Sequence, residues 1–298
     1  MARQARRLYG QGVPWLHDEV ARRLDSKLEW VKMQPASWVE WAPAWGGGQA
    51  LVSARYPQAR HGRLAAAESV MARDAAVPAE GRGMAGWRQA LQHWWTGADA
   101  RVWRPDELDQ APWMADGAQL LWANMSLHTL SDLPGTLRLW ARQLAPQGFL
   151  MCSGLGPDTA RELRALYAAE GWGLPTIDFI DMHDLGDELA KAGFADPVMD
   201  MERIQLTWAS PEALLAELRA WGGNVAQGRF EGCRSRAWRQ RWLEAVGRHL
   251  RDADGRIRLT VEVVYGHAIK PEARAPLQPE SRVSLEDMRR MVRRPRES

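Results

Sequence analysis

The chain contains little cysteine, and its cations and aromatic residues are drawn from few residue types. Its only two cysteines, Cys152 and Cys233, lie far apart in the sequence and form neither a disulfide framework nor a zinc site. No apolar run approaches the ~18 residues of a membrane span. No apolar stretch follows the basic start MARQARRLYG, so no signal peptide is expected. These absences favour a cytoplasmic protein without a membrane partner or a bound metal.

Arginine and tryptophan are correspondingly abundant. Only four of the 39 cationic residues are lysine, and 17 tryptophans stand beside four tyrosines and four phenylalanines. A GC-rich coding bias explains this imbalance without a special function. Hydrophobic residues make up 46% of the 298 positions, which is enough for a packed core. The formal net charge of +2 argues against a general nucleic-acid binder.

The hydrophobic pattern predicts strands that alternate with helices. Apolar side chains at helical spacing predict an amphipathic helix over residues 15–32. Short apolar stretches then predict strands at 37–41, 119–127 and 149–153. Helical patterns follow at 134–144 and at 158–170, where Asp158 is expected to cap the helix.

This alternation predicts an α/β fold with a doubly wound, mostly parallel sheet. The last two predicted strands flank 48 residues of helical pattern rather than one crossover helix, so we expect an antiparallel last strand. The predicted division is an N-terminal helical segment (1–32), a Rossmann-like core (33–208), a helical insertion that forms a cap (209–256), the last core strand (257–270) and a basic tail (271–298).

A glycine-rich turn follows the first predicted strand. The segment reads Glu40-Trp-Ala-Pro-Ala-Trp-Gly46-Gly-Gly48 and opens a predicted helix. A strand that runs into glycines before a helix is typical of nucleotide-cofactor sites, because glycine lets the backbone approach the ligand. An ordinary glycine-rich turn would have the same sequence signature.

Several segments in order resemble a known family. The turn resembles the first motif of class I S-adenosylmethionine-dependent methyltransferases, in which Glu40 and Gly46 fit the pattern. Further blocks are similar to the malonyl-acyl-carrier-protein O-methyltransferase family of biotin synthesis; they cover residues 120–128, 133–153, 156–166, 181–208 and 261–271. The resemblance implies a Rossmann-like methyltransferase that methylates the free carboxylate of a carrier-bound acyl chain.

The resemblance also implies a cofactor site for S-adenosylmethionine. Its members on this chain would be Glu40, Gly46, Gly48, Asp106 (or Glu107) and Asn124. Asn124 ends a predicted strand, so it could equally be a strand-end turn residue. Trp41, Trp45 and Trp122 lie near the predicted crevice and would either stack on an adenine ring or fill the space in its absence. The resemblance assigns no catalytic residue.

The sequence departs from the family pattern at four positions. Ala42 and Ala44 replace two motif glycines, and Pro43 stands between them. Leu64 stands where the superfamily places a ribose-binding acid, and Glu68 is one helical turn further on. These departures define the alternative function, a pseudo-methyltransferase that has lost the cofactor and acts as a binding or scaffolding protein. Methylation of another small acid or of nucleic acid is a third hypothesis.

Two charged clusters complete the candidates. The insertion carries Arg234, Arg241 and Arg248 seven residues apart, which suggests one helix face that docks an acidic acyl carrier protein. A solvated surface face is the alternative.

The second cluster could form a metal or base site and consists of Asp181, His183, Asp184 and Asp187. Acids at the start of a helix are, however, expected from the helix dipole and from capping.

Overall fold

The computed structural model describes residues 13–43, 45–64, 102–104, 110 and 115–272. These residues form a seven-stranded sheet with the strand order β3-β2-β1-β4-β5-β7-β6. Neighbouring strands from β3 to β5 run parallel, and β7 pairs antiparallel with both β5 and β6, which confirms the predicted fold class. The strands are β1 (Ser37–Trp41), β2 (Arg60–Leu64), β3 (Val102–Trp103), β4 (Ala118–Ala123), β5 (Leu144–Leu155), β6 (Ala195–Trp208) and β7 (Ile257–Ile269).

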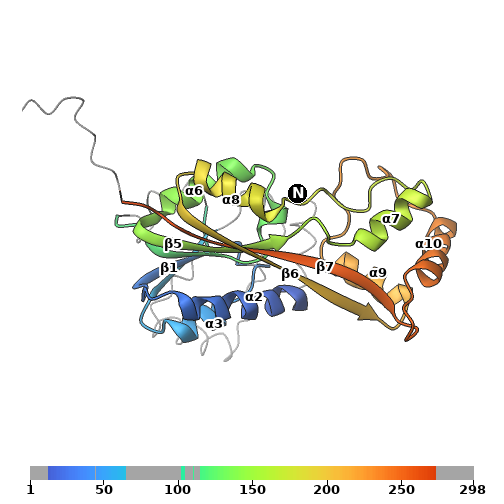
Figure 1. The fold of residues 1–298 in the computed structure, drawn as a ribbon, viewed down its shortest axis with the longest axis horizontal. Coiled ribbons are helices and arrows are strands. Elements are labelled where there is room, and N and C mark those ends of the chain that lie inside the picture. The colour runs from blue at the N-terminus through green and yellow to red at the C-terminus, as the bar shows by residue number, and fades with distance from the viewer. Residues whose placement is uncertain (1–12, 44, 65–101, 105–109, 111–114, 273–298) are drawn as a thin grey trace, which may run out of the picture.

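Helices cover both faces of the sheet (Figure 1). On one face lie α2 (Trp15–Lys27) and α3 (Gln49–Arg55), and on the other lie α6 (Leu133–Gln143) and α8 (Met182–Lys191). The long strands β6 and β7 extend beyond the others toward a group of three helices: α7 (Arg161–Ala169), α9 (Pro211–Ala220) and α10 (Arg236–His249). Two short 3-10 helices, η1 (Leu28–Trp30) and η3 (Leu127–Thr129), follow α2 and β4.

Three apolar clusters hold these layers together. Side chains alternate across a strand, so Val39 of β1 packs toward α6 and α8 while Trp38 packs toward α2 and α3. The third cluster joins α7, α9 and α10 to the extended ends of β6 and β7, with Trp242 and Leu259 among its buried members. The helices of the predicted cap (209–256) therefore share a small core with α7, built on the two longest strands.

Two predicted helices have other limits in the structure. The first helix ends at Lys27 and continues only as η1 to Trp30. The helix predicted from residue 158 begins at Arg161, and Asp158 does not cap it. The segment is instead tied to β7, because the amide of Ala160 donates to the carbonyl of Thr260. Asp158 pairs with Arg203 of β6 at 2.6 Å.

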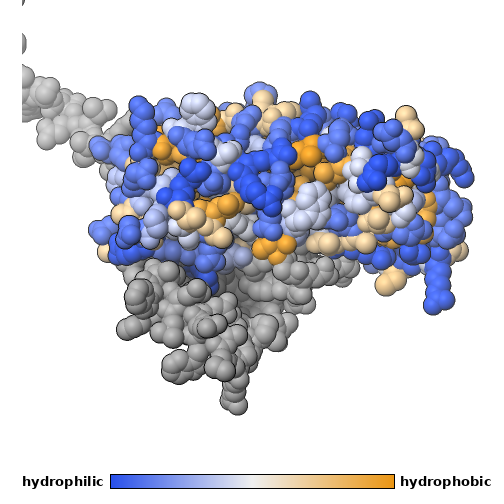
Figure 2. Space-filling model, turned by 90° about the horizontal axis from the view of Figure 1, so that it is seen from below, coloured by the Kyte–Doolittle hydropathy of each residue, from blue (hydrophilic) through white to orange (hydrophobic). Residues whose placement is uncertain are grey.

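The surface of the described part is mixed in polarity. Figure 2 shows hydrophobic residues in separate groups among hydrophilic ones on the face that it presents. No helix among the described residues combines the length and the apolar character that crossing a membrane requires.

Candidate functional site

The glycine turn lies at the carboxyl end of β1, the edge where open parallel sheets bind ligands. Ala42 has a φ of +52°, and Gly47 and Gly48 have φ values of +74° and +99°. The amide of Gly46 donates to the carbonyl of Ala42 over 3.0 Å, which closes the turn. Alanine thus takes the left-handed conformation at a motif position where the family has glycine, at a cost of about 1–2 kcal/mol.

Trp122 of β4 lies directly beneath this turn. Its buried indole Nε1 donates to the carbonyl of Gly47 over 3.0 Å. A Cβ atom at Gly48 would lie 2.8 Å from the indole, closer than carbon atoms can approach. Glycine at position 48 is therefore required both by the backbone conformation and by the close approach of Trp122.

Asn124 follows β4 and is fully buried. Its amide nitrogen donates to the carbonyls of His17 (2.8 Å) and Gly46, and its side-chain oxygen accepts from Ser153 Oγ over 2.8 Å. Both amide hydrogens are used in these bonds. Asn124 thus lies just beyond the carboxyl end of β4 and positions the glycine turn against α2 and β5.

Glu40 of β1 is a buried carboxylate beside the turn. Its Oε2 atom lies 3.5 Å from Nε2 of His61, whose ring stacks on Trp38 at 3.8 Å. Neither atom has a hydrogen-bond partner among the described residues. A buried carboxylate oxygen without a partner is costly, so this position is suited to a ligand that brings a donor.

Among the described residues, no acidic side chain stands at the end of β2, where the resemblance places a ribose-binding acid. β2 ends at Leu64, whose side chain is buried in the cluster with Val39 and Trp41. Ala44, Glu68, Asp106 and Glu107 lie outside the described residues. Trp41, Trp45 and Trp122 are each at most 1% exposed, so the tryptophans near the turn fill the core.

Two buried histidines extend the site away from the turn. His17 of α2 donates from Nδ1 to the carbonyl of Trp45 over 2.6 Å, and its ring meets that of His128 edge-on, with centroids 6.4 Å apart. Burial lowers the pKa of His17 to about 4 and that of His128 to about 3, so both rings are neutral near pH 7. Nδ1 of His128 accepts from the amide of Leu155, which leaves the ring hydrogen on Nε2.

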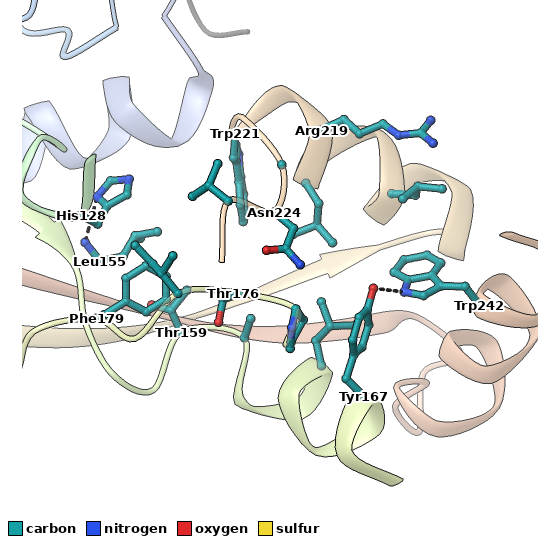
Figure 3. Close-up of a pocket in the computed structure, with 18 of the residues that line it drawn as sticks. His128, Leu155, Thr159, Tyr167, Thr176, Phe179, Arg219, Trp221, Asn224 and Trp242 are labelled. Carbon is teal, nitrogen blue, oxygen red and sulfur yellow. Dashed lines mark hydrogen bonds between the residues drawn. The ribbon is translucent and has the colours of Figure 1, made fainter. Parts of the chain in front are cut away.

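His128 stands at one end of a cavity of about 270 Å³, here named the inner cavity. Its lining is mainly apolar and comes from α7, α9, α10 and the segments 175–179 and 223–225. Figure 3 shows His128 and Leu155 at one end and Tyr167 and Trp242 at the other, where Trp242 Nε1 donates to the Tyr167 hydroxyl over 3.0 Å. The inner cavity thus lies between the sheet and the helices α9 and α10, and only His17 stands between its His128 end and Trp45 of the glycine turn.

The three arginines predicted to dock a carrier do not share a helix face. Arg241 and Arg248 are exposed on α10, but Arg234 precedes the first helical residue, Arg236. The guanidinium carbon of Arg234 lies 4.0 Å from the ring centre of Phe230 and 4.5 Å from that of Trp238. The seven-residue spacing does not place the three arginines on one helix face, because the helix begins only after the N-cap Ser235.

The acidic cluster of residues 181–187 spans the N-cap and the first two turns of α8. Asp181 is the N-cap and accepts from the backbone amide of His183 over 2.8 Å. This bond lowers the pKa of Asp181. No group of three His, Cys, Asp or Glu side chains placed to hold a metal ion occurs within the described ranges.

The strand order, the antiparallel β7 and the glycine turn after β1 together define the class I methyltransferase fold. The solved structure of the YcgJ protein from Bacillus subtilis has the same fold, with a TM-score of 0.50 at 10% identity over 85% of this chain and 99% of that one. No protein-family model matches the chain.

Curated relatives specify the family. A malonyl-[acyl-carrier protein] O-methyltransferase of Laribacter hongkongensis is 38% identical over 263 residues, which cover 87% of this chain and 84% of that protein. The protein of the same name from Gallionella capsiferriformans is 35% identical, with 87% and 85% covered. This chain belongs to the malonyl-[acyl-carrier protein] O-methyltransferase family.

The sequence patterns did not point to either buried histidine. His128 comes four residues after Asn124, immediately beyond a predicted strand, and this position was the signal available for it. His17 carried no signal, because a histidine on an amphipathic helix is usually a packing residue. Only the tertiary structure shows that the two rings meet.

Proposed function

We propose that this protein transfers a methyl group from S-adenosylmethionine to the free carboxylate of a malonyl-type chain on an acyl carrier protein, a step of biotin synthesis. Membership of the family supports this function. The observation that carries it is the continuity between turn and cavity: His17 contacts Trp45 of the turn on one side and His128 of the inner cavity on the other.

The substrate chain would lie in the inner cavity with its carboxylate toward His128. An N–H at Nε2 of a neutral imidazole can hold one carboxylate oxygen without protonating it. The other oxygen then stays ionised and reactive. The apolar walls around Leu155 and Leu163 exclude water from the chain and fix its direction.

The described residues suit the methionine end of the cofactor. A Cβ at Gly46 would lie 3.2–3.4 Å from the backbone oxygens of Trp41, Ala42 and Asn124, so glycine lets the turn pack closely against the ends of β1 and β4. Glu40 would accept from the cofactor's ammonium group with its unpartnered Oε2 atom. When bound, S-adenosylmethionine supplies an activated methyl group on a sulfonium. Asn124 would act by holding the turn in place, and Gly48 by closing it.

A second candidate function is binding of a carrier-linked chain without methyl transfer. The observation that favours it is Leu64 at the end of β2, where a carboxylate would otherwise accept both ribose hydroxyls. Loss of such a bidentate contact costs about 2–3 kcal/mol, or about two decades of affinity. The pseudo-methyltransferase would keep the inner cavity and the exposed arginines Arg241 and Arg248 for its partner.

Two measurements test the proposal together. Isothermal titration with S-adenosylmethionine and S-adenosylhomocysteine measures cofactor binding, after removal of any that co-purifies. Transfer of labelled methyl to malonyl-carrier protein measures activity. Micromolar binding with transfer is the expected result. Carrier binding without cofactor binding at millimolar concentration would reject methyl transfer in favour of the second candidate.

A further inference from the structure

A second cavity in the cap contains two arginines. It measures about 210 Å³ and is lined by Trp172, Asn224, Arg229, Phe230, Arg234 and Trp238, among others; we name it the arginine cavity. Both arginines are half-buried, so their charges are only partly screened by water.

Neither arginine has a carboxylate partner among the described residues. Arg234 donates to the carbonyl of Trp172 over 2.8 Å, and Arg229 donates to that of Ala226 over 3.2 Å. A guanidinium has five N–H donors, so most donors of both side chains are unused. The aromatic rings of Phe230 and Trp238 hold the Arg234 guanidinium in one orientation before any ligand arrives.

The arginine cavity adjoins the inner cavity. Tyr167, Asn224 and Trp238 line both, and Tyr167 marks the end of the inner cavity opposite His128. The order is therefore His128, an apolar middle section, and then two uncompensated guanidiniums. A ligand that matches this order is linear, with an anion at one end and a largely neutral chain leading from it.

We propose that the arginine cavity binds the phosphodiester of a 4′-phosphopantetheine arm, whose neutral chain continues into the inner cavity. The inference deepens the proposed function, on which it rests, by naming the part of the carrier that the cap recognises. Arginine suits the role because its planar donors match phosphate oxygens in pairs. The arm then presents its thioester-linked chain toward His128.

The test compares three probes by isothermal titration without cofactor: 4′-phosphopantetheine, pantetheine and inorganic phosphate. The wild-type protein is expected to bind 4′-phosphopantetheine at least tenfold more tightly than either of the others. The double variant Arg229→Gln/Arg234→Gln should lose this preference, and Arg229→Gln alone should weaken it if Arg234→Gln unfolds the cap. Arg236→Gln/Arg239→Gln, which changes two exposed arginines of α10 that have no assigned role, is the matched control and should keep the preference for 4′-phosphopantetheine.

Three results would overturn the inference: equal binding of phosphorylated and unphosphorylated arm, an unchanged preference in Arg229→Gln, or inorganic phosphate binding as tightly as 4′-phosphopantetheine. Failure of the proposed function gives a different pattern. Arm binding would persist while methyl transfer to malonyl-carrier protein is absent. Failure of the inference alone would leave methyl transfer intact without any preference for the phosphate.

Discussion

At the scale of single residues, the glycine turn combines two backbone requirements at different positions. Gly48 needs both its left-handed conformation and the missing Cβ, because Trp122 lies against it. Ala42 needs only the conformation, and it takes that conformation despite its Cβ. The two positions therefore respond to substitution in opposite directions.

Gly48→Ala should destabilise the protein by more than 2 kcal/mol and abolish cofactor binding, because strain and a clash with Trp122 add together. Gly193→Ala is a close control. Gly193 has a φ of +97°, but nothing lies within 4 Å of a Cβ there. This control should lose only about 1 kcal/mol. If urea unfolding shows that Gly48→Ala and Gly193→Ala lose the same free energy of unfolding, Trp122 does not restrict the turn.

Ala42→Gly should stabilise the protein by about 0.5–1 kcal/mol, because glycine adopts a φ of +52° without the steric cost that alanine carries. Ala50→Gly, in the exposed face of α3, should destabilise it by a similar amount. Opposite changes in the unfolding midpoint are expected. A destabilised Ala42→Gly variant would contradict the left-handed conformation of residue 42.

At the scale of elements, α2 fixes the site from outside the sheet. His17 holds the carbonyl of Trp45, and Asn124 holds the carbonyl of His17. The same helix reaches β6 through Lys27 and Asp200, whose charged atoms lie 2.5 Å apart. Detachment of α2 would thus release the glycine turn and expose His128 together.

The buried histidines predict how stability depends on pH. Their folded pKa values, about 4 and about 3, lie below the unfolded value of 6.5, so protons bind to the unfolded chain first. The free energy of unfolding should therefore fall as the pH drops below about 6.5. Each histidine contributes about 1.4 kcal/mol per pH unit once the pH is well below 6.5.

His17→Asn tests this dependence, because the asparagine amide can still donate to the carbonyl of Trp45 without titrating. Between pH 6.5 and 5, the free energy of unfolding measured in urea should fall less steeply with decreasing pH than it does in the wild-type protein. At pH 7.5 the variant should be less stable by about 1–2 kcal/mol, because the smaller side chain leaves a cavity beside Trp45, but this loss should not change with pH. An unchanged slope would mean that His17 is not buried in the folded state.

At the scale of the whole molecule, the cap and the core enclose the inner cavity between them. The cap stands on the extended ends of β6 and β7, and its cluster includes Trp208 and Ile257 from these strands. On the proposed function, α9 and α10 would select the substrate, while the turn that would hold the cofactor belongs to the core.

Leu215→Trp should separate these two functions. Leu215 of α9 lines the inner cavity, so an indole there would fill space that the chain of the substrate needs. We expect turnover of malonyl-carrier protein to fall more than tenfold, with cofactor affinity unchanged. Leu215→Met conserves volume and should retain activity. Equal activity of both variants would place the substrate elsewhere.

Much of the fold follows from local pattern. The period of two in strands and of 3.6 in helices predicted the parallel core and the two long strands around the cap. Helix starts were less predictable. Aspartate is a favourable N-cap residue, so Asp158 is expected to begin the helix. The amide of Ala160 instead donates to the carbonyl of Thr260 in β7, and the helix begins at Arg161. Pairing with a distant strand is not encoded in the neighbouring residues.

The sequence by itself determined the family, the alternation of strands and helices and the glycine turn, because these depend on sequence similarity, on periodicity and on residues close along the chain. The tertiary structure alone decided what the polar residues do. It turned Asn124 inward to brace the turn, filled the core with Trp41 and Trp45, and brought His17 against His128. Each of these outcomes depends on contacts between segments far apart in sequence, and such contacts are set by how the layers pack.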